Sequence, residues 1–202
     1  MREIQIFNYS ELNKDAKEKA IEVVRNTDIF GQELVWDLNE AFESTLKSLG
    51  LDGIEIDFSL SHSQGDGVAF YGYIDNEHLW NWVNDSKLSD DEVKLIALCQ
   101  LGRANLDINI ERNFLSSRYS HPNTMEVSIP FYDGDDLPFD DDRMEELMSG
   151  LELKIKEVVQ DKSMELERLG YNMINDYYSD ENLNDILEES SLEFYEDGTL
   201  YR

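Results

Sequence analysis

Apolar and polar residues alternate along several short stretches of the chain, a period of two that predicts half-buried β-strands. In residues 54–60 the apolar Ile54, Ile56 and Phe58 alternate with Glu55 and Asp57. Further strands are expected in these segments: 4–9, 68–74, 106–110 and 125–131. Because the turn-rich residues 61–67 join 54–60 to 68–74, these two strands are predicted to form a hairpin.

Elsewhere apolar residues recur every three or four positions, which predicts amphipathic helices. Two helix starts carry capping signals: Asn13 precedes one helix, and Ser89 with Glu92 forms a capping box for another. The predicted helices cover these segments: 13–24, 31–49, 89–101, 144–169 and 173–187.

The order of these elements favours an antiparallel α+β fold, because short loops join most adjacent strands. We expect a single domain over residues 1–202, with a mainly antiparallel sheet of about five strands packed with helices. A long C-terminal helix precedes a terminal hairpin with an Asp197-Gly198 turn. The sequence contains no internal repeat and no Gly-, Ser- or Pro-rich linker.

Charge narrows the range of possible partners. The chain holds 45 Asp and Glu against 17 Lys and Arg, a formal net charge of -28. Such a field repels nucleic acid and anionic lipid and attracts basic protein surfaces. The hydrophobic fraction of 41% is enough for a core, so we expect a folded chain despite the charge.

The acidic residues have an informative distribution. Residues 131–202 hold 22 Asp and Glu but only six Lys and Arg. Other acids occupy the outward positions of predicted strands, where a shared sheet would gather them on one face. Helical lysines that cover this face are the alternative to a basic partner. The candidate partner-binding residues are Asp133, Asp135, Asp136, Asp140, Asp141, Asp142, Glu55, Asp57, Asp107, Glu111 and Glu126.

Signals for a metal or cofactor site are missing from the sequence. The one cysteine, Cys99, excludes an internal disulfide and is expected to be a buried thiol. His62, His78 and His121 lack zinc-site spacing, and the acidic run at 133–144 lacks the spacing of a calcium loop. No nucleotide-binding motif is present. We therefore expect no metal and no cofactor.

Membrane and export signals are also missing. No apolar run approaches the ~20 residues that span a bilayer, and no apolar segment of a signal peptide follows Arg2. We expect a cytoplasmic protein with no membrane partner.

The densest group of reactive side chains lies in the turn between the two strands of the predicted hairpin, at residues 61–67. Ser63, Gln64 and Asp66 could belong to a small enzyme or ligand-binding module, with Tyr71, Tyr73, Trp80 and Trp82 as walls. Adjacent residues on one tight turn cannot form a catalytic triad, so we favour a structural turn in which Asp66 binds local backbone.

Three stretches of the sequence suggest a relationship. They are the run Tyr9–Ala20, the sequence Ser63-Gln64-Gly65-Asp66-Gly67 within Phe58–Phe70, and the Glu196-Asp197-Gly198 turn. In these stretches the chain resembles a loose family of small acidic bacteriophage proteins of uncharacterised function. The resemblance implies a phage origin and brings no catalytic residues.

The combined signals favour a non-enzymatic, phage-encoded inhibitor. We expect it to bind a basic, nucleic-acid-binding surface of a host protein by charge mimicry, in the cytoplasm of an infected bacterium. A defence nuclease, such as a restriction or CRISPR effector, fits the phage resemblance as the target. A host polymerase fits the charge of the chain equally well. The enzyme or ligand-binding module at the Ser63–Gly67 turn and a structural virion component stay open as alternatives. Direct binding to nucleic acid is not expected.

Overall fold

The described part of the chain combines helices with two antiparallel sheets, which confirms the predicted α+β class. The chain divides into two compact units. The terminal unit comprises Met1–Leu38 and Tyr171–Arg202, and the sheet unit comprises Asn39–Gly170. The expectation of a single domain stays a prediction. The computed structural model describes these segments: residues 5–27, 30–74, 76–83, 87–113, 120–130 and 137–201.

The sheet unit contains a four-stranded antiparallel sheet in the order β2-β3-β4-β5. Its strands are β2 (Leu51–Ser59), β3 (Gly67–Ile74), β4 (Ile108–Arg112) and β5 (Met125–Ser128). The pairing of β2 with β3 confirms the predicted hairpin. The main sheet has one strand fewer than expected because the opening strand, β1 (Phe7–Asn8), pairs in the terminal unit instead.

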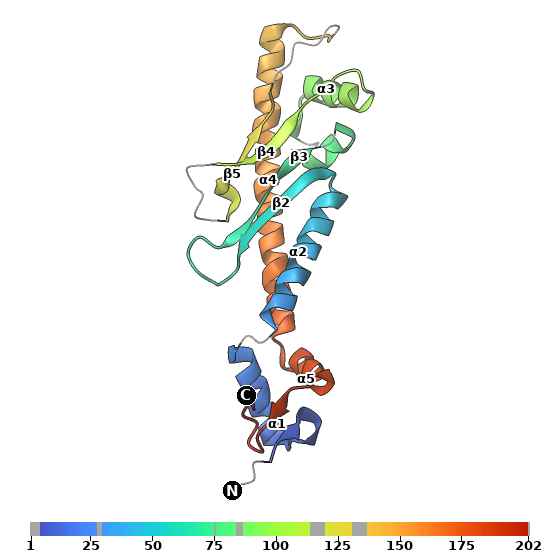
Figure 1. Ribbon diagram of the computed structural model, residues 1–202. Coiled ribbons are helices and arrows are strands. Elements are labelled where there is room, and N and C mark those ends of the chain that lie inside the picture. Colours follow the sequence, from blue (N-terminus) through green and yellow to red (C-terminus); the bar gives the residue numbers. More distant parts are fainter. Residues whose placement is uncertain are drawn as a thin grey trace. The chain divides into compact units, whose positions relative to one another are not determined.

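Helices cover one face of this sheet. The long helix α4 (Asp141–Tyr177) passes behind the sheet in Figure 1, where the Ser163 hydroxyl donates to the carbonyl oxygen of Val68. On α2 (Gly31–Ser48), the Phe42 ring meets a sheet residue, Phe58, edge to face. Fully buried apolar side chains form the core between sheet and helices: Phe42, Leu46, Val68, Phe70, Ile108, Ile110, Leu151, Ile155 and Val159.

Two helical segments complete the sheet unit. The 3-10 segment η2 (Asn76–Trp82) buries the Trp82 ring, whose Nε1 donates to the carbonyl oxygen of Leu49 at 2.9 Å. The helix α3 (Asp90–Gln100) begins with the predicted capping box of Ser89 and Glu92. The Glu92 carboxylate also accepts from Lys154 Nζ on α4 at 2.6 and 2.5 Å.

The C-terminal helices differ from the prediction in one respect. Residues 173–177 belong to the long helix α4, and not to a further helical piece. The break comes at Ser179, whose hydroxyl caps α5 (Asp180–Glu189) by accepting from the backbone N–H of Asn182 at 3.3 Å. The helix α4 continues through Gly170, which is buried.

The terminal unit packs α1 (Lys14–Thr27) and α5 around its own small core. The strand β1 pairs with β6 (Glu193–Phe194), and the predicted hairpin at the C-terminus is confirmed by a bridge between Phe194 and Leu200. Buried members of this core come from both ends of the chain: Tyr9, Leu12, Ala16, Ala20, Val24, Leu183, Leu187 and Phe194.

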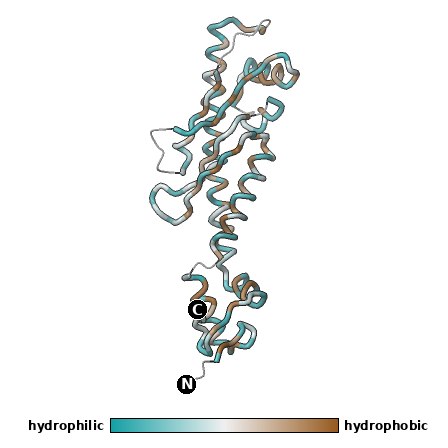
Figure 2. Tube along the Cα trace, in the orientation of Figure 1, coloured by the Kyte–Doolittle hydropathy of each residue, from teal (hydrophilic) through white to brown (hydrophobic). Residues whose placement is uncertain are grey.

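Hydropathy follows this packing. In Figure 2 hydrophobic and hydrophilic stretches interleave along the helices, as expected for helices with one buried side. In the part of the chain that the structure describes, no helix is both long enough and apolar enough to cross a membrane.

Candidate functional site

A row of glutamates crosses the polar face of the four-stranded sheet. Glu55 on β2 lies opposite Tyr71 on β3, and Glu111 on β4 lies directly opposite Glu126 on β5. Gly72 on β3 pairs with Ile110 on β4, and these two residues are the chain neighbours of Tyr71 and Glu111. The three glutamates are exposed. Together with Asp57 they form the acidic sheet face, so the structure brings together four of the acids that the strand pattern selected.

Arg112 supplies positive charge at the acidic sheet face. It forms an ion pair with Asp57, and its guanidinium lies 5.0 Å from the centroid of the Tyr71 ring. The pKa of the Tyr71 hydroxyl is raised: burial raises it most strongly, a hydrogen bond with Thr124 opposes this, and the Glu55 carboxylate adds to the rise. Because Arg112 pairs with it, the charge of the Asp57 carboxylate is balanced within the fold.

The remaining charge of this face is not neutralised in the same way. Glu55, Glu111 and Glu126 form no ion pair with any Lys or Arg that the structure describes. Lysine side chains that cover the face, the alternative left open by the sequence, are thus not seen among the described residues. Like charges directly opposite each other destabilise a sheet, so the pair Glu111 and Glu126 opposes folding.

Asp107 lies just before β4 and lines a pocket of ≈ 460 Å³. We call it the sheet pocket. Asp52, which lies opposite Tyr73 in the register of β2 and β3, contributes a second carboxylate. The residues that line the sheet pocket are Asp52, Tyr73, Ile74, Asn76, Leu106, Asp107, Ile108 and Asn109.

The acids at the start of α4 have a partly structural role. The Asp140 carboxylate accepts from the backbone N–H of Arg143 at 2.9 Å and so caps the helix. Asp141 and Asp142 are exposed in the first turn, where negative charge interacts favourably with the helix dipole. The candidates Asp133, Asp135 and Asp136 lie outside the described residues.

The predicted turn between β2 and β3 folds around the Asp66 carboxylate. That carboxylate accepts from the backbone N–H groups of Ser61 at 2.6 Å and Ser63 at 2.8 Å. It also accepts from the hydroxyls of Ser59 at 2.8 Å and Ser63 at 2.9 Å. The structural turn predicted from the sequence is confirmed, and the hydroxyl of Ser63 is bound to the turn itself.

A pocket of ≈ 450 Å³ adjoins this turn and is lined by Gln64, Gly65, Asp66, His121, Pro122 and Asn123. We call it the turn pocket. Gln64 and Asp66 of the alternative site reach it, whereas Ser63 is not among the described residues that line it. The aromatic side chains considered as walls of the alternative site are not among the described residues that line the turn pocket: Tyr71 and Trp82 are buried, Tyr73 lines the sheet pocket, and Trp80 donates to Gln100.

We expect Gly67→Val to destabilise the protein more than Ser63→Ala or Gln64→Ala. Gly67 has a φ of +151°, and a Cβ there would lie 2.7 Å from the carbonyl oxygen of Ser120. The valine should cost about 2–4 kcal/mol through strain and overpacking, and the lost exposed hydrogen bonds of the Ser63 hydroxyl about 0.5–1.5 kcal/mol each. Urea unfolding measures both. An unfolded Ser63→Ala variant beside an unaffected Gly67→Val variant would contradict the structural role of the turn.

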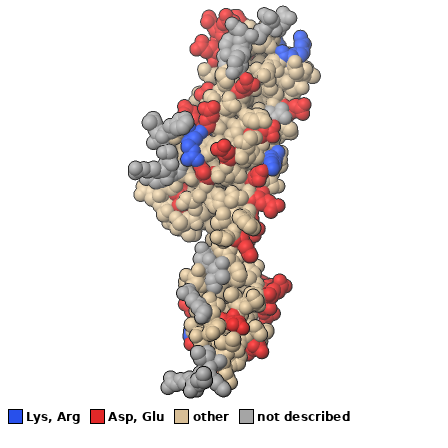
Figure 3. All heavy atoms as spheres, in the orientation of Figure 1, with Lys and Arg blue, Asp and Glu red and all other residues tan. Residues whose placement is uncertain are grey.

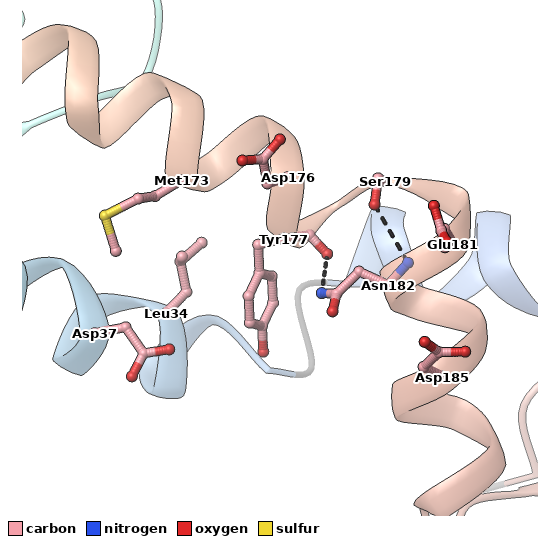
Figure 4. Close-up of a pocket in the computed structure, with 9 residues that line it drawn as sticks. All are labelled: Leu34, Asp37, Met173, Asp176, Tyr177, Ser179, Glu181, Asn182 and Asp185. Carbon is pink, nitrogen blue, oxygen red and sulfur yellow. Dashed lines mark hydrogen bonds between the residues drawn. The ribbon is translucent and has the colours of Figure 1, made fainter.

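A third pocket, in the terminal unit, was not found from the sequence. It has a volume of ≈ 590 Å³, and we call it the acidic pocket. Figure 4 shows the Tyr177 ring projecting between α2 and α5, with Asp37 on one side and Asp185 on the other. Its lining residues are Leu34, Asp37, Met173, Asp176, Tyr177, Ser179, Glu181, Asn182 and Asp185.

Hydrogen bonds hold the walls of the acidic pocket. The Tyr177 hydroxyl donates to the carbonyl oxygen of Phe30 at 3.3 Å, and the Asn182 side chain donates to the carbonyl oxygen of Tyr177 at 2.9 Å. The four lining carboxylates form no ion pair with a Lys or Arg in the described segments. Nearby Asp180, in contrast, pairs with Arg25. In Figure 3 acidic side chains outnumber basic ones on the visible face.

Cys99, the one cysteine of the chain, is buried on α3. Burial raises the pKa of the Cys99 thiol to about 11, so the nucleophilic thiolate is scarce at neutral pH. The described residues contain no group of three or more His, Cys, Asp or Glu that could hold a metal ion.

A comparison with protein families gives a match over most of the chain. The sequence profile of a family described as Domain of unknown function (DUF8835) matches residues 34–184. The matched range includes all four strands of the main sheet, and therefore the acidic sheet face and the sheet pocket. No curated protein and no solved structure matches the chain significantly.

Proposed function

The chain belongs to the DUF8835 family, and we propose that it is an acidic inhibitor that binds a basic, nucleic-acid-binding surface of another protein by charge mimicry. The observation that carries the proposal is the row of Glu55, Glu111 and Glu126 across a rigid sheet, without ion pairs to the described cations. Their mutual repulsion opposes folding, and the Lys and Arg of a partner would relieve it.

The total charge supports the same proposal. At a net charge of -28 the chain repels phosphates and attracts basic grooves over a distance of about a Debye length, ~8–10 Å. Duplex DNA presents one negative charge per ~1.7 Å of its axis, and neighbouring strands of a sheet lie about 4.8 Å apart. Ordered carboxylates on adjacent strands therefore form an array that a phosphate-binding groove can accept.

The target class is also part of this proposal. The resemblance to small acidic phage proteins supports a phage-encoded protein that acts in the cytoplasm of an infected bacterium. A host defence nuclease, such as a restriction or CRISPR effector, is then the partner that we would test first.

A second candidate function rests on the turn pocket. Its imidazole, carboxylate and amide groups from His121, Asp66 and Asn123 would suit a small polar ligand. Against it, the Asp66 carboxylate is engaged by its own turn, and the Nδ1 atom of His121 accepts from the backbone N–H of Asn123 at 3.2 Å. Binding of a small metabolite that Gln64→Ala abolishes, with the Asp66 hydrogen bonds of the turn left in place, would favour this candidate over the inhibitor.

Capture experiments with a charge-neutralised face test the inhibitor proposal. The triple variant Glu55→Gln/Glu111→Gln/Glu126→Gln should bind its bacterial partner about tenfold more weakly than the wild type, because three exposed contacts of ~0.5 kcal/mol each sum to ~1.5 kcal/mol. The immobilised chain, wild type or variant, is incubated with bacterial lysate at about 50 and 200 mM salt. Duplex DNA is then used to elute the bound proteins. We expect nucleic-acid-binding proteins, released by DNA and by salt.

The matched control removes the same number of charges elsewhere. The variant Glu145→Gln/Glu152→Gln/Asp161→Asn changes acids of α4 and should capture the partner as the wild type does. Equal losses in both variants would show that only net charge matters, and capture that DNA does not reverse would contradict the mimicry.

A further inference from the structure

The sheet pocket combines an aromatic ring, two carboxylates and an apolar lining in one cavity of ≈ 460 Å³. Lysine and arginine are missing from its described lining residues. The pocket also shares strands β2, β3 and β4 with the acidic sheet face. Because alternate residues of a strand face the same side, Tyr73 and Asn109 lie on the side of Tyr71 and Glu111, and a partner that docks on this face would reach the pocket.

The aromatic ring belongs to Tyr73, whose side chain is 52% exposed. In the β2 strand, the register shifts between Asp52 and Glu55, and Gly53 lies within this irregularity. A Cβ at Gly53 would lie 3.1 Å from Cε1 of the Tyr73 ring, so the ring packs closely on the glycine. The ring is thus supported on one side and accessible on another, as a platform for a cation must be.

The carboxylates are held near this ring. Asp52 lies opposite Tyr73 in the strand register. The Asp107 carboxylate accepts from the side-chain amide of Asn105 at 3.2 Å, and the Asn105 carbonyl accepts in turn from the Asn76 amide. Asn76 also accepts from the backbone N–H of Leu106 at 3.3 Å. This chain of hydrogen bonds fixes the loop that presents Asp107 to the pocket.

We propose that the sheet pocket binds one arginine side chain of the basic partner. This inference rests on the proposed function. The planar guanidinium stacks on Tyr73 and donates in a fork to the carboxylates of Asp52 or Asp107, while the aliphatic stem lies against the apolar lining from Ile74 and Leu106. Lysine is the poorer fit, because its ammonium is compact, strongly hydrated and unable to form the fork.

The pocket can be tested without the partner. The probe is N-acetyl-L-arginine amide, titrated into the ¹⁵N-labelled full chain and followed by amide chemical shifts. The lysine amide and the citrulline amide, which has the shape of arginine without its charge, serve as comparison probes. We expect saturable shifts centred on Asp52, Tyr73, Asp107 and Asn109 for arginine, weaker shifts for lysine and none for citrulline.

Variants identify the groups responsible. Tyr73→Leu should weaken arginine binding roughly two- to fivefold, as expected for an exposed cation–π contact. Asp52→Asn/Asp107→Asn should weaken it by up to roughly tenfold. The control Asp37→Asn, in the acidic pocket, should leave the affinity unchanged. The amide spectrum of each variant verifies that it is folded.

Several results would overturn the assignment. Equal shifts with citrulline, equal affinity for lysine, or shifts spread over acidic residues throughout the chain would each reject an arginine pocket. If arginine fails to bind while the basic partner is still captured, only the pocket is rejected. If arginine binds but no nucleic-acid-binding protein is captured, only the inhibitor proposal is rejected.

Discussion

Gly198→Ala should destabilise the terminal unit strongly, by about 2–5 kcal/mol. Gly198 has a φ of +83°, and a Cβ there would lie 2.1 Å from the carbonyl oxygen of Ala16 on α1. The Asp197-Gly198 turn thus packs directly on a helix backbone, which cannot move away as a flexible side chain can. Urea unfolding followed by far-UV circular dichroism gives the change in midpoint.

Gly102→Ala is the matched control for this prediction. Gly102 also has a positive φ, +65°, but a Cβ there would have nothing within 4 Å. It should therefore show only the cost of the left-handed conformation, about 1–2 kcal/mol. Equal losses in the two variants would contradict the close packing of the turn on α1.

Glu92→Ala should also cause a large loss of stability, about 2–4 kcal/mol. Glu92 is 3% exposed and accepts from Lys154 Nζ at 2.6 and 2.5 Å and from the backbone N–H of Ser89 at 2.7 Å. Gly150 leaves room for the carboxylate, since a Cβ there would lie 2.9 Å from Oε1. Removing Glu92 alone leaves the partly buried Lys154 ammonium without its partner.

The double variant Glu92→Leu/Lys154→Met separates charge from packing. It removes both charged groups and should lose less stability than Glu92→Ala, because no buried charge is left unpaired. A double variant that is as unstable as Glu92→Ala, or less stable, would contradict this expectation.

The pH dependence of the Glu92 contribution has a definite sign. Burial raises the pKa of Glu92, but the hydrogen bonds from Lys154 and Ser89 outweigh burial and lower it below its ordinary value of 4.5. A lowered pKa means that the stabilisation is complete above the unfolded value and is lost as pH falls through the folded one. The difference between wild type and Glu92→Gln should therefore shrink below about pH 4.

Sequence patterns predicted well those elements whose formation depends on residues close together in the chain. Alternation in 54–60 placed β2, and the Ser89 capping box began α3 where expected. The end of α4 was misplaced because the apolar spacing of 173–177 suits either the long helix or a separate one, and only the structure shows that these residues continue α4. The pairing of β1 with β6 joins the two ends of the chain, and no local pattern reports such a contact.

The candidate site shows the same division. A period of two puts Glu55 and Asp57 on one face of their strand, so their shared exposure was predictable from sequence. The register that sets Glu111 opposite Glu126 depends on strand pairing, which only the structure gives. The acidic pocket was missed because Asp37 and Asp185 are far apart in the chain and are two acids among 45.

A charge-mimicking inhibitor places its acidic sheet face on the nucleic-acid-binding surface of its partner. A competition measurement tests this proposal: fluorescence anisotropy follows labelled duplex DNA bound to the captured partner during titration with the chain. We expect the wild type to displace the DNA and its apparent affinity to fall about tenfold or more between about 50 and 200 mM salt. The triple glutamine variant of the sheet face should displace the DNA poorly. A partner that holds the chain and the DNA together, or an affinity that salt leaves unchanged, would contradict charge mimicry.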